Sequence, residues 1–191
     1  PITMVAARPA VLAVNPHLPA LSVKELIALA KRRAGALSYG TGISGSADHM
    51  TGELFKIMAG INAVHVPYKG GPGMLSDVVN GNLQFTFVGL PAAQRFIRSG
   101  KLRAIGISGL KRSPLLPEVP TVDEAGVPGF EVITWYGMVG PRGLPKDIAE
   151  RIAAEVHRSL RLPDVQERFA AQGLDPVFMS PAEFGTVLAS D

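Results

Sequence analysis

The sequence contains no cysteine, and this absence excludes several kinds of chemistry at once. Without cysteine there is no disulfide, no thiol nucleophile and no thiolate metal site. No apolar run approaches the roughly 20 residues that a membrane-spanning helix needs, and no signal peptide is visible. A chain that opens at Pro1 without an initiator methionine is most simply a processed or partial product.

Aromatic residues and clustered basic residues are also scarce, which argues against a nucleic-acid-binding surface. Aromatic residues make up 6% of the 191 residues, and the formal net charge is only +3. Lysine and arginine are scattered apart from short runs at residues 31–33 and 111–112, which we interpret as solvated faces. We therefore expect no nucleic-acid partner. With 47% apolar and 18% charged residues, the composition is that of a globular protein with one large domain or two small ones.

Short apolar runs alternate with helical patterns along nearly the whole chain, which is typical of an α/β fold with mainly parallel sheets. The expected strands are residues 2–6, 11–14, 36–39, 63–66, 84–88, 104–108, 132–139 and 175–178. Helices are expected between them, and three segments have the spacing of capping boxes: residues 22–25, 121–124 and 180–183. Glycine stands where helices should end, for example at Gly60 and Gly81.

The most informative segment is a turn rich in glycine and hydroxyl groups at residues 38–49, between an expected strand and an expected helix. Glycine lets the backbone come close to a bound group. The free N–H groups of a first helical turn, with the positive end of the helix dipole, attract anions. Thr41, Ser44 and Ser46 add hydroxyl donors. The segment therefore predicts an anion site, and a plain turn whose hydroxyls cap a helix remains the alternative.

Two enzymatic interpretations of this turn fit less well. Gly40, Gly42 and Gly45 match the G-x-G-x-x-G dinucleotide template. That template needs an acidic residue after the next strand to hold a ribose, whereas the strand 63–66 is followed by Lys69 and no carboxylate. The G-x-S-x-G pattern of hydrolases lacks its last glycine here, and no histidine and acid follow in the expected order. We therefore expect no cofactor, no metal site and no catalysis.

Two seams rich in proline or glycine, at residues 15–19 and 126–130, divide the pattern. If both are crossings, residues 1–14 hold a strand of lobe 1 and the first hinge crossing. Residues 15–130 then form a complete lobe 2, and residues 131–191 hold the second crossing and the C-terminal part of lobe 1. Two crossings between two lobes make a hinge with a cleft. The turn and the loop after the next strand both lie at the carboxyl edge of lobe 2, where open α/β sheets bind ligands.

Six motifs are spread over the chain: residues 37–39 with 45, 46 and 49, then residues 52–55, 64–70, 100–104, 112–114 and 117–126. Among them are V-H-V-P-Y-K-G and P-E-V-P-T-V-D-E-A-G. Together they resemble the substrate-binding proteins of tripartite tricarboxylate transporters, the Bug family of periplasmic receptors. The resemblance implies a type II periplasmic binding-protein fold, a two-lobed "Venus flytrap" that closes on a small organic carboxylate. It implies periplasmic location, delivery of the ligand to the membrane components of the transporter, and no catalysis.

The resemblance also implies a ligand site built from the turn and its neighbours. The expected ligand-binding residues are Thr41, Gly42, Ser44, Gly45, Ser46, His49, Tyr68, Lys69 and Trp135. The alternatives are a hydrogen-bonded helix histidine for His49, a solvated lysine for Lys69, and hinge packing for Trp135. His65 lies inside a strand pattern and is expected to be structural.

The family's chain begins before Pro1 and continues beyond Asp191, so the resemblance implies that this chain is a fragment. We expect it to lack the N-terminal part of lobe 1, to form at most half a pocket, and to self-associate through uncovered apolar faces. A different class of function stays open, because the effector-sensing domains of some transcription regulators share the two-lobed fold. That alternative predicts an upstream helix-turn-helix in the parent gene, and a signal peptide there would exclude it.

Overall fold

The computed structural model describes residues 1–190, and the chain divides into two compact units. Unit 1 consists of Pro1–Arg8 with Thr134–Asp191, and unit 2 of Pro9–Ile133. Both boundaries fall within strands, since β1 (Thr3–Val14) and β6 (Ile133–Met138) each have residues in both units. The assignment of lobes and hinge crossings stays a prediction.

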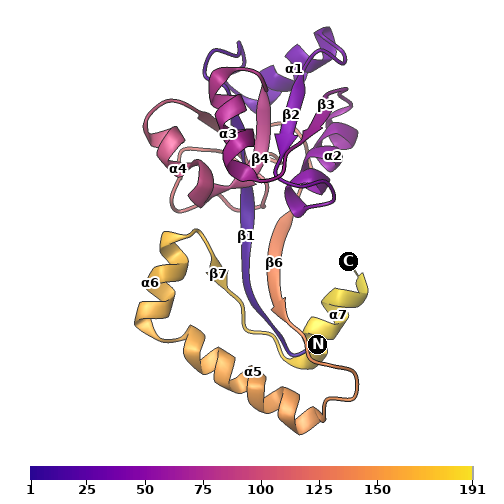
Figure 1. Cartoon of the computed structure of the whole chain (residues 1–191), viewed down its shortest axis with the longest axis vertical. Helices are drawn as coiled ribbons and strands as arrows, with labels where there is room; N and C mark the ends of the chain where they lie inside the picture. Colours follow the sequence, from indigo (N-terminus) through magenta and orange to yellow (C-terminus); the bar gives the residue numbers. More distant parts are fainter. Residues whose placement is uncertain (191) are drawn as a thin grey trace. The chain divides into compact units, whose positions relative to one another are not determined.

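Unit 2 alternates strands and helices after the long strand β1 (Figure 1). Its elements are α1 (Val23–Arg32), β2 (Ser38–Thr41), α2 (Ala47–Ala59), β3 (Val64–Pro67), α3 (Gly71–Asn80), β4 (Phe85–Gly89), α4 (Leu90–Arg98) and β5 (Arg103–Ile107). The α/β class predicted from the sequence is therefore confirmed.

The sheet of unit 2 is mixed rather than mainly parallel. Its strand order is β3-β2-β4-β1-β5. β2 pairs in parallel with both β3 and β4, whereas β1 pairs antiparallel with β4 and with β5. A strand followed by a crossover helix must return parallel, and this rule governs β2, β3 and β4. β1 enters the sheet through long-range pairing, without a crossover helix to fix its direction, so the expectation of mainly parallel strands failed there.

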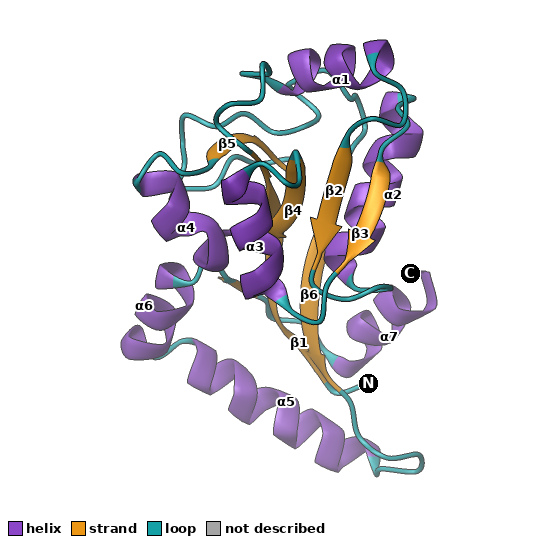
Figure 2. Cartoon of the chain, turned by 45° about the horizontal axis from the view of Figure 1, so that its top comes forward, coloured by secondary structure: helices purple, strands orange, loops and turns teal. Residues whose placement is uncertain are grey.

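The side chains of β1 alternate between two apolar cores, one on each face of the sheet. Leu12 and Val14 pack with buried residues of α1 and α2, including Phe55. Val11 and Ala13 pack with buried residues of α3 and α4. Because successive strand residues point to opposite faces, this alternation places two helices on each face. Figure 2 shows α3 and α4 on one side of the strands and α2 on the other.

β1 joins two segments that the sequence predicted as separate strands, residues 2–6 and 11–14. Pro9 lies between them and has no N–H to donate to a ladder. The antiparallel pairing with β4 begins at Ala10, and Ala6 and Ala7 pair with β7 (Asp175–Pro176). The proline therefore sits between two ladders, where a missing donor does not interrupt either of them.

Two of the predicted capping boxes begin helices. The Ser22 hydroxyl accepts the Glu25 N–H at 3.3 Å at the start of α1, and Ser180 does the same for Glu183 at 3.2 Å at the start of α7 (Pro181–Ser190). At residues 121–124 the reciprocal bonds also form, at 3.0 and 3.1 Å, but they close a turn rather than a helix. Gly126, with a φ of 118°, follows too soon for a helix to propagate.

Unit 1 contains the first part of β1 with β6, β7 and three helices, α5 (Lys146–Leu160), α6 (Pro163–Ala171) and α7. Its buried apolar residues are fewer than those of unit 2; Ile2, Ala149 and Ala153 form one small cluster. A groove of about 460 Å³ runs along α5, and it is lined mainly by apolar side chains, including Ile152 and Val156. None of the helices in residues 1–190 is long and apolar enough to cross a membrane.

Candidate functional site

Three parallel strands of unit 2 end at one edge of the sheet, and the next element after each of them is a helix. The ends of β2 and β3 lie side by side, since Thr41 pairs with Pro67 and the Thr41 carbonyl accepts the Tyr68 N–H at 2.9 Å. β4, which is parallel to β2, ends at Gly89. The N-termini of α2, α3 and α4 therefore begin at this edge. Three positive helix ends at one edge favour an anion, as the sequence predicted for the turn.

Two loops at this edge touch through their backbones: the β2–α2 loop (residues 42–46) and the β3–α3 loop (residues 68–70). A Cβ added to Gly42 would stand 3.3 Å from the nitrogen of Gly71 and 3.4 Å from the carbonyl carbon of Gly70. Such contacts are tighter than ordinary van der Waals packing, so a side chain at Gly42 would force the loops apart. Glycine here brings two stretches of backbone together at the edge.

The β2–α2 loop combines satisfied and available donors. Ser46 is the N-cap of α2; its hydroxyl accepts the His49 N–H at 3.4 Å. The N–H of Gly45, a residue with a φ of 79°, donates to Nδ1 of His49 at 3.0 Å. Ser44 is exposed and forms no hydrogen bond within residues 1–190. The loop therefore offers the Ser44 side chain to a ligand, while the Gly45 N–H is already held by the protein.

Thr41, at the end of β2, is fully buried. Its Oγ1 lies 2.7 Å from Nε2 of His65 and 3.4 Å from the carbonyl oxygen of Ile43. The hydroxyl thus anchors the start of the β2–α2 loop. Its expected contact with a ligand stays a prediction, and such a contact requires the hydroxyl to exchange one of these partners.

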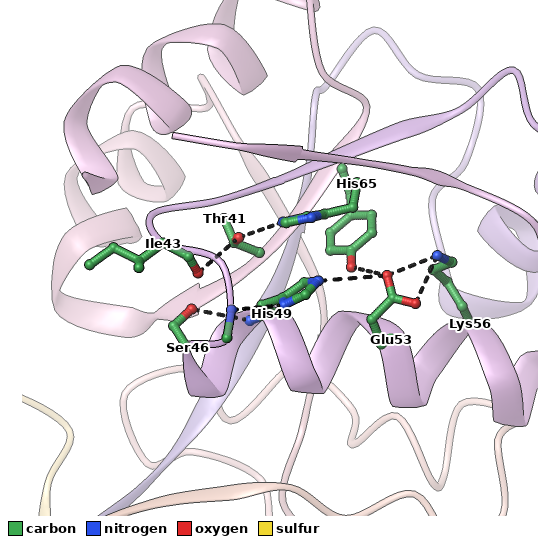
Figure 3. Close-up of polar contacts among 9 residues, drawn as sticks. Thr41, Ile43, Ser46, His49, Glu53, Lys56 and His65 are labelled. Carbon is green, nitrogen blue, oxygen red and sulfur yellow. Dashed lines mark hydrogen bonds and ion pairs between the residues drawn. The ribbon is translucent and has the colours of Figure 1, made fainter. Parts of the chain in front are cut away.

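A polar network extends from the loop along α2 (Figure 3). The rings of His49 and His65 stack with centroids 3.9 Å apart, and Nε2 of His49 lies 3.9 Å from Oε1 of Glu53. The same carboxylate accepts hydrogen bonds from Tyr39 at 2.5 Å and from Lys56 at 2.8 and 2.9 Å. The described residues contain no group of three or more histidine and acidic side chains placed to hold a metal ion.

The network sets the protonation of its members. Burial acts to raise the pKa of Glu53, but hydrogen bonds from Lys56 and Tyr39 outweigh it, so the pKa of this carboxyl lies below its usual value. Burial lowers the pKa of His65, and so do any positive charge on the adjacent His49 ring and the charge of Lys56. Burial and the neighbouring Glu53 raise the pKa of Tyr39. At neutral pH, Glu53 is therefore an anion and His65 a neutral ring.

Two further predicted residues belong to the β3–α3 loop. The Tyr68 hydroxyl donates to the carboxylate of Asp77, which raises the pKa of Tyr68 to about 12 and lowers the pKa of Asp77. Lys69 is exposed and forms no ion pair within residues 1–190. Its ammonium is available to an anion at this edge. The roles of both residues in ligand binding stay predictions.

Trp135 belongs to unit 1, whereas all the other predicted site residues belong to unit 2. It lies in β6, is half-buried, and packs edge-to-face on Phe184 with ring centroids 5.5 Å apart. A Cβ on Gly137 would overlap the ring of Phe184, so this part of unit 1 is closely packed. The packing role is thus visible, and the ligand role stays a prediction.

Sequence reasoning missed the residues that support the loop. Tyr39, Glu53 and Lys56 were not singled out, and His65 was expected to be structural only. One signal was available: His49, Glu53 and Lys56 have the i, i+4 and i, i+3 spacings that place side chains on one helix face. The stacking of His49 on His65 depends on how α2 lies against β3, and no local pattern encodes it.

Comparison with known proteins identifies the family. Residues 1–190 match the profile of the family described as the tripartite tricarboxylate transporter family receptor. The chain belongs to this family. The resemblance predicted from the six motifs is therefore confirmed.

Two relatives of this receptor-family chain match over its whole length. The "UPF0065 protein in tcbD-tcbE intergenic region" of Pseudomonas sp. (strain P51) is 32% identical over 192 residues, covering 100% of this chain and 57% of that protein. "Protein BugT" of Bordetella pertussis is 34% identical over 191 residues, covering 100% of this chain and 59% of that protein. The chain thus spans less than two thirds of the length of these curated relatives.

Solved structures show the same fold. A protein of R. palustris solved with adipate is 34% identical with a TM-score of 0.89, covering 100% of this chain and 64% of that one. The periplasmic binding protein BugD is 30% identical with a TM-score of 0.83, covering 100% and 63%. MatC from Rhodopseudomonas palustris, solved with bound malate, is 28% identical with a TM-score of 0.82, covering 100% and 64%. The predicted periplasmic binding-protein fold is confirmed for the part that this chain spans.

Proposed function

We propose that the protein is a periplasmic solute-binding receptor that captures a small organic carboxylate and delivers it to the membrane components of a tripartite transporter. The observation that supports it best is the sheet edge of unit 2, where α2, α3 and α4 all begin. Ser44 and Lys69 stand there as an unpaired hydroxyl and an unpaired ammonium among the described residues. Available hydrogen-bond donors together with positive helix ends suit the binding of an anion.

The relatives support the same class of ligand. Two structural neighbours of the family were solved with dicarboxylates, adipate in one and malate in the other. A linear dicarboxylate could place one carboxylate at this edge through hydrogen bonds and helix dipoles. This receptor function is favoured over the effector domain of a regulator, because the matching family is described as a transporter receptor and two of the matches carry Bug names.

Isothermal titration calorimetry of the protein with adipate, malate and citrate tests the proposal. The diamide of adipate is the matched control, since it keeps the chain length and removes the charge. We expect saturable binding of at least one carboxylate and no detectable binding of the diamide. Equal binding of adipate and its diamide would contradict an anion site, and the absence of binding across a wider panel of di- and tricarboxylates would contradict the receptor function.

A further inference from the structure

Two stacked imidazole rings hold the two ends of the β2–α2 loop. His65, from β3, contacts the Thr41 hydroxyl at the start of the loop at 2.7 Å. His49, from the first turn of α2, accepts the Gly45 N–H near the end of the loop at 3.0 Å. The rings themselves stack with an interplanar angle of 24°. The loop is therefore fastened at both ends to one pair of histidines, here called the histidine clasp (His49 and His65).

The bond to Gly45 fixes the protonation state that His49 needs. A backbone N–H can only donate, so Nδ1 of His49 must be the acceptor and the neutral ring must carry its proton on Nε2. That nitrogen faces the carboxylate of Glu53 at 3.9 Å. A protonated ring would place an Nδ1–H donor against the Gly45 N–H donor. The bond that fastens the end of the loop therefore exists only while His49 is neutral.

The surroundings of the clasp act on its charge in opposite directions. Glu53 on α2 favours a positive ring. Lys56 on the same helix opposes it, as does the positive end of the α2 dipole. Tyr39 from β2 packs on His65 with centroids 5.1 Å apart and donates its hydroxyl to Glu53. Because the two rings stack at 3.9 Å, a positive charge on His49 disfavours a positive charge on His65.

We propose that His49 and His65 are positioning residues that fix the β2–α2 loop, and that protonation of His49 frees the Gly45 end of the loop and weakens carboxylate capture. The second half of this proposal rests on the receptor function proposed above. The first half concerns the ligand-free protein alone. Two substitutions of His49 distinguish its ring nitrogens. The side-chain oxygen of asparagine takes the position of Nδ1, whereas the polar end of glutamine takes the position of Nε2.

The ligand-free test follows the Gly45 amide and the histidine rings by NMR between pH 8 and pH 5. We expect the Gly45 amide signal to shift, and its hydrogen exchange to accelerate, together with the protonation of His49. In His49→Asn the amide should stay protected and cease to follow pH, and in His49→Gln it should be unprotected throughout. The chain has four histidines, so the variants also assign the ring signals. A Gly45 amide that ignores the titration of His49 in the unsubstituted protein would overturn the clasp.

The binding test measures adipate and malate affinity between pH 8 and pH 6, where ligand carboxylates stay largely ionised. We expect affinity to fall by more than about twofold toward pH 6, as a growing fraction of the protein carries a protonated His49, and to change less than twofold in His49→Asn. An affinity that rises toward pH 6 in the unsubstituted protein and not in His49→Asn would mean that a cationic His49 contacts the ligand directly, which also overturns the clasp. If no carboxylate binds at any pH, the receptor function fails, and the NMR result still decides the positioning role.

Discussion

Gly52 of α2 faces the ring of Tyr39 in β2 so closely that a Cβ on Gly52 would overlap Cε2 and Cζ of the ring. Both residues are buried. The close approach seats the Tyr39 hydroxyl 2.5 Å from Oε1 of Glu53, the carboxylate that faces His49. A residue with no side chain therefore sets the distance between α2 and the sheet at the point where the histidine clasp is supported.

Replacing Gly52 by alanine should destabilise the protein by about 1–3 kcal/mol, the usual cost of overpacking a tight core site. The methyl group has to push α2 away from Tyr39, and the hydrogen bond to Glu53 should lengthen or break. Urea unfolding measures the loss. The NMR signal of the Gly45 amide should also move, because Glu53 and His49 shift with the helix.

Gly71→Ala is the matched control in the same unit. A Cβ on Gly71, at the start of α3, meets no atom within 4 Å. Alanine should therefore be neutral there, or stabilising by up to about 1 kcal/mol, because it restricts the unfolded chain. If the two alanine variants have the same stability, steric exclusion at Gly52 is not what holds Tyr39 in place.

Much of unit 2 could be predicted from local sequence, because its elements have local start and stop signals. Gly60 and Gly81 end α2 and α3 in the left-handed conformation, as expected. The strand directions were harder to predict, because the antiparallel pairing of β1 with β4 and β5 depends on contacts between residues far apart in the sequence. At residues 121–124 the capping-box hydrogen bonds form, but no helix follows, because the residues after the turn cannot continue one.

The stability of the protein should decrease on mild acidification because of His65. The pKa of His65 is lower in the folded protein than the usual 6.5, so between these two values the unfolded chain binds more protons. Stability from the neutral ring is fully present above about pH 6.5, is lost as pH falls toward the folded-state pKa, and then levels off. Urea midpoints measured in steps from pH 8 to pH 4.5 check this. In His65→Gln the urea midpoint should not change over this pH range. A midpoint that rises on acidification in the unsubstituted protein would refute the role of His65.

A second loss of stability, at lower pH, should come from Glu53. Its folded-state pKa lies below the usual 4.5, so the folded protein holds the carboxylate more tightly than the unfolded chain does. The stability this provides is present above about pH 4.5 and is lost as pH falls through the folded-state pKa. In Glu53→Gln the amide occupies the same space near Tyr39 and Lys56 but does not titrate in this range. The variant should be less stable at neutral pH and should lose less stability below pH 4.5; parallel curves for the two proteins would show that Glu53 is not the source.

The candidate site was predictable where it depends on backbone and not where it depends on side-chain pairing. Glycine and serine between a strand and a helix were enough to place the β2–α2 loop at the sheet edge. The engagement of the Gly45 N–H by His49 was not predictable, since it requires a particular ring orientation against His65. The sequence left His49 open between a ligand contact and a hydrogen-bonded helix histidine. The structure shows both of its ring nitrogens directed at protein groups, and the ligand role stays a prediction.

The last prediction separates charge from shape at Gly45. Its φ of 79° is left-handed, a conformation that asparagine and aspartate adopt more readily than other side chains, and a Cβ there meets no atom within 4 Å. Gly45→Asp and Gly45→Asn should therefore have similar stabilities in thermal melts. Only the aspartate adds a fixed negative charge to the loop. If this loop receives a carboxylate, calorimetry should show binding at least about 100-fold weaker for the aspartate variant, or about 2.7 kcal/mol, and within about tenfold of the unsubstituted protein for the asparagine variant. Equal losses of affinity in the two variants would make Gly45 a structural turn and place the carboxylate elsewhere.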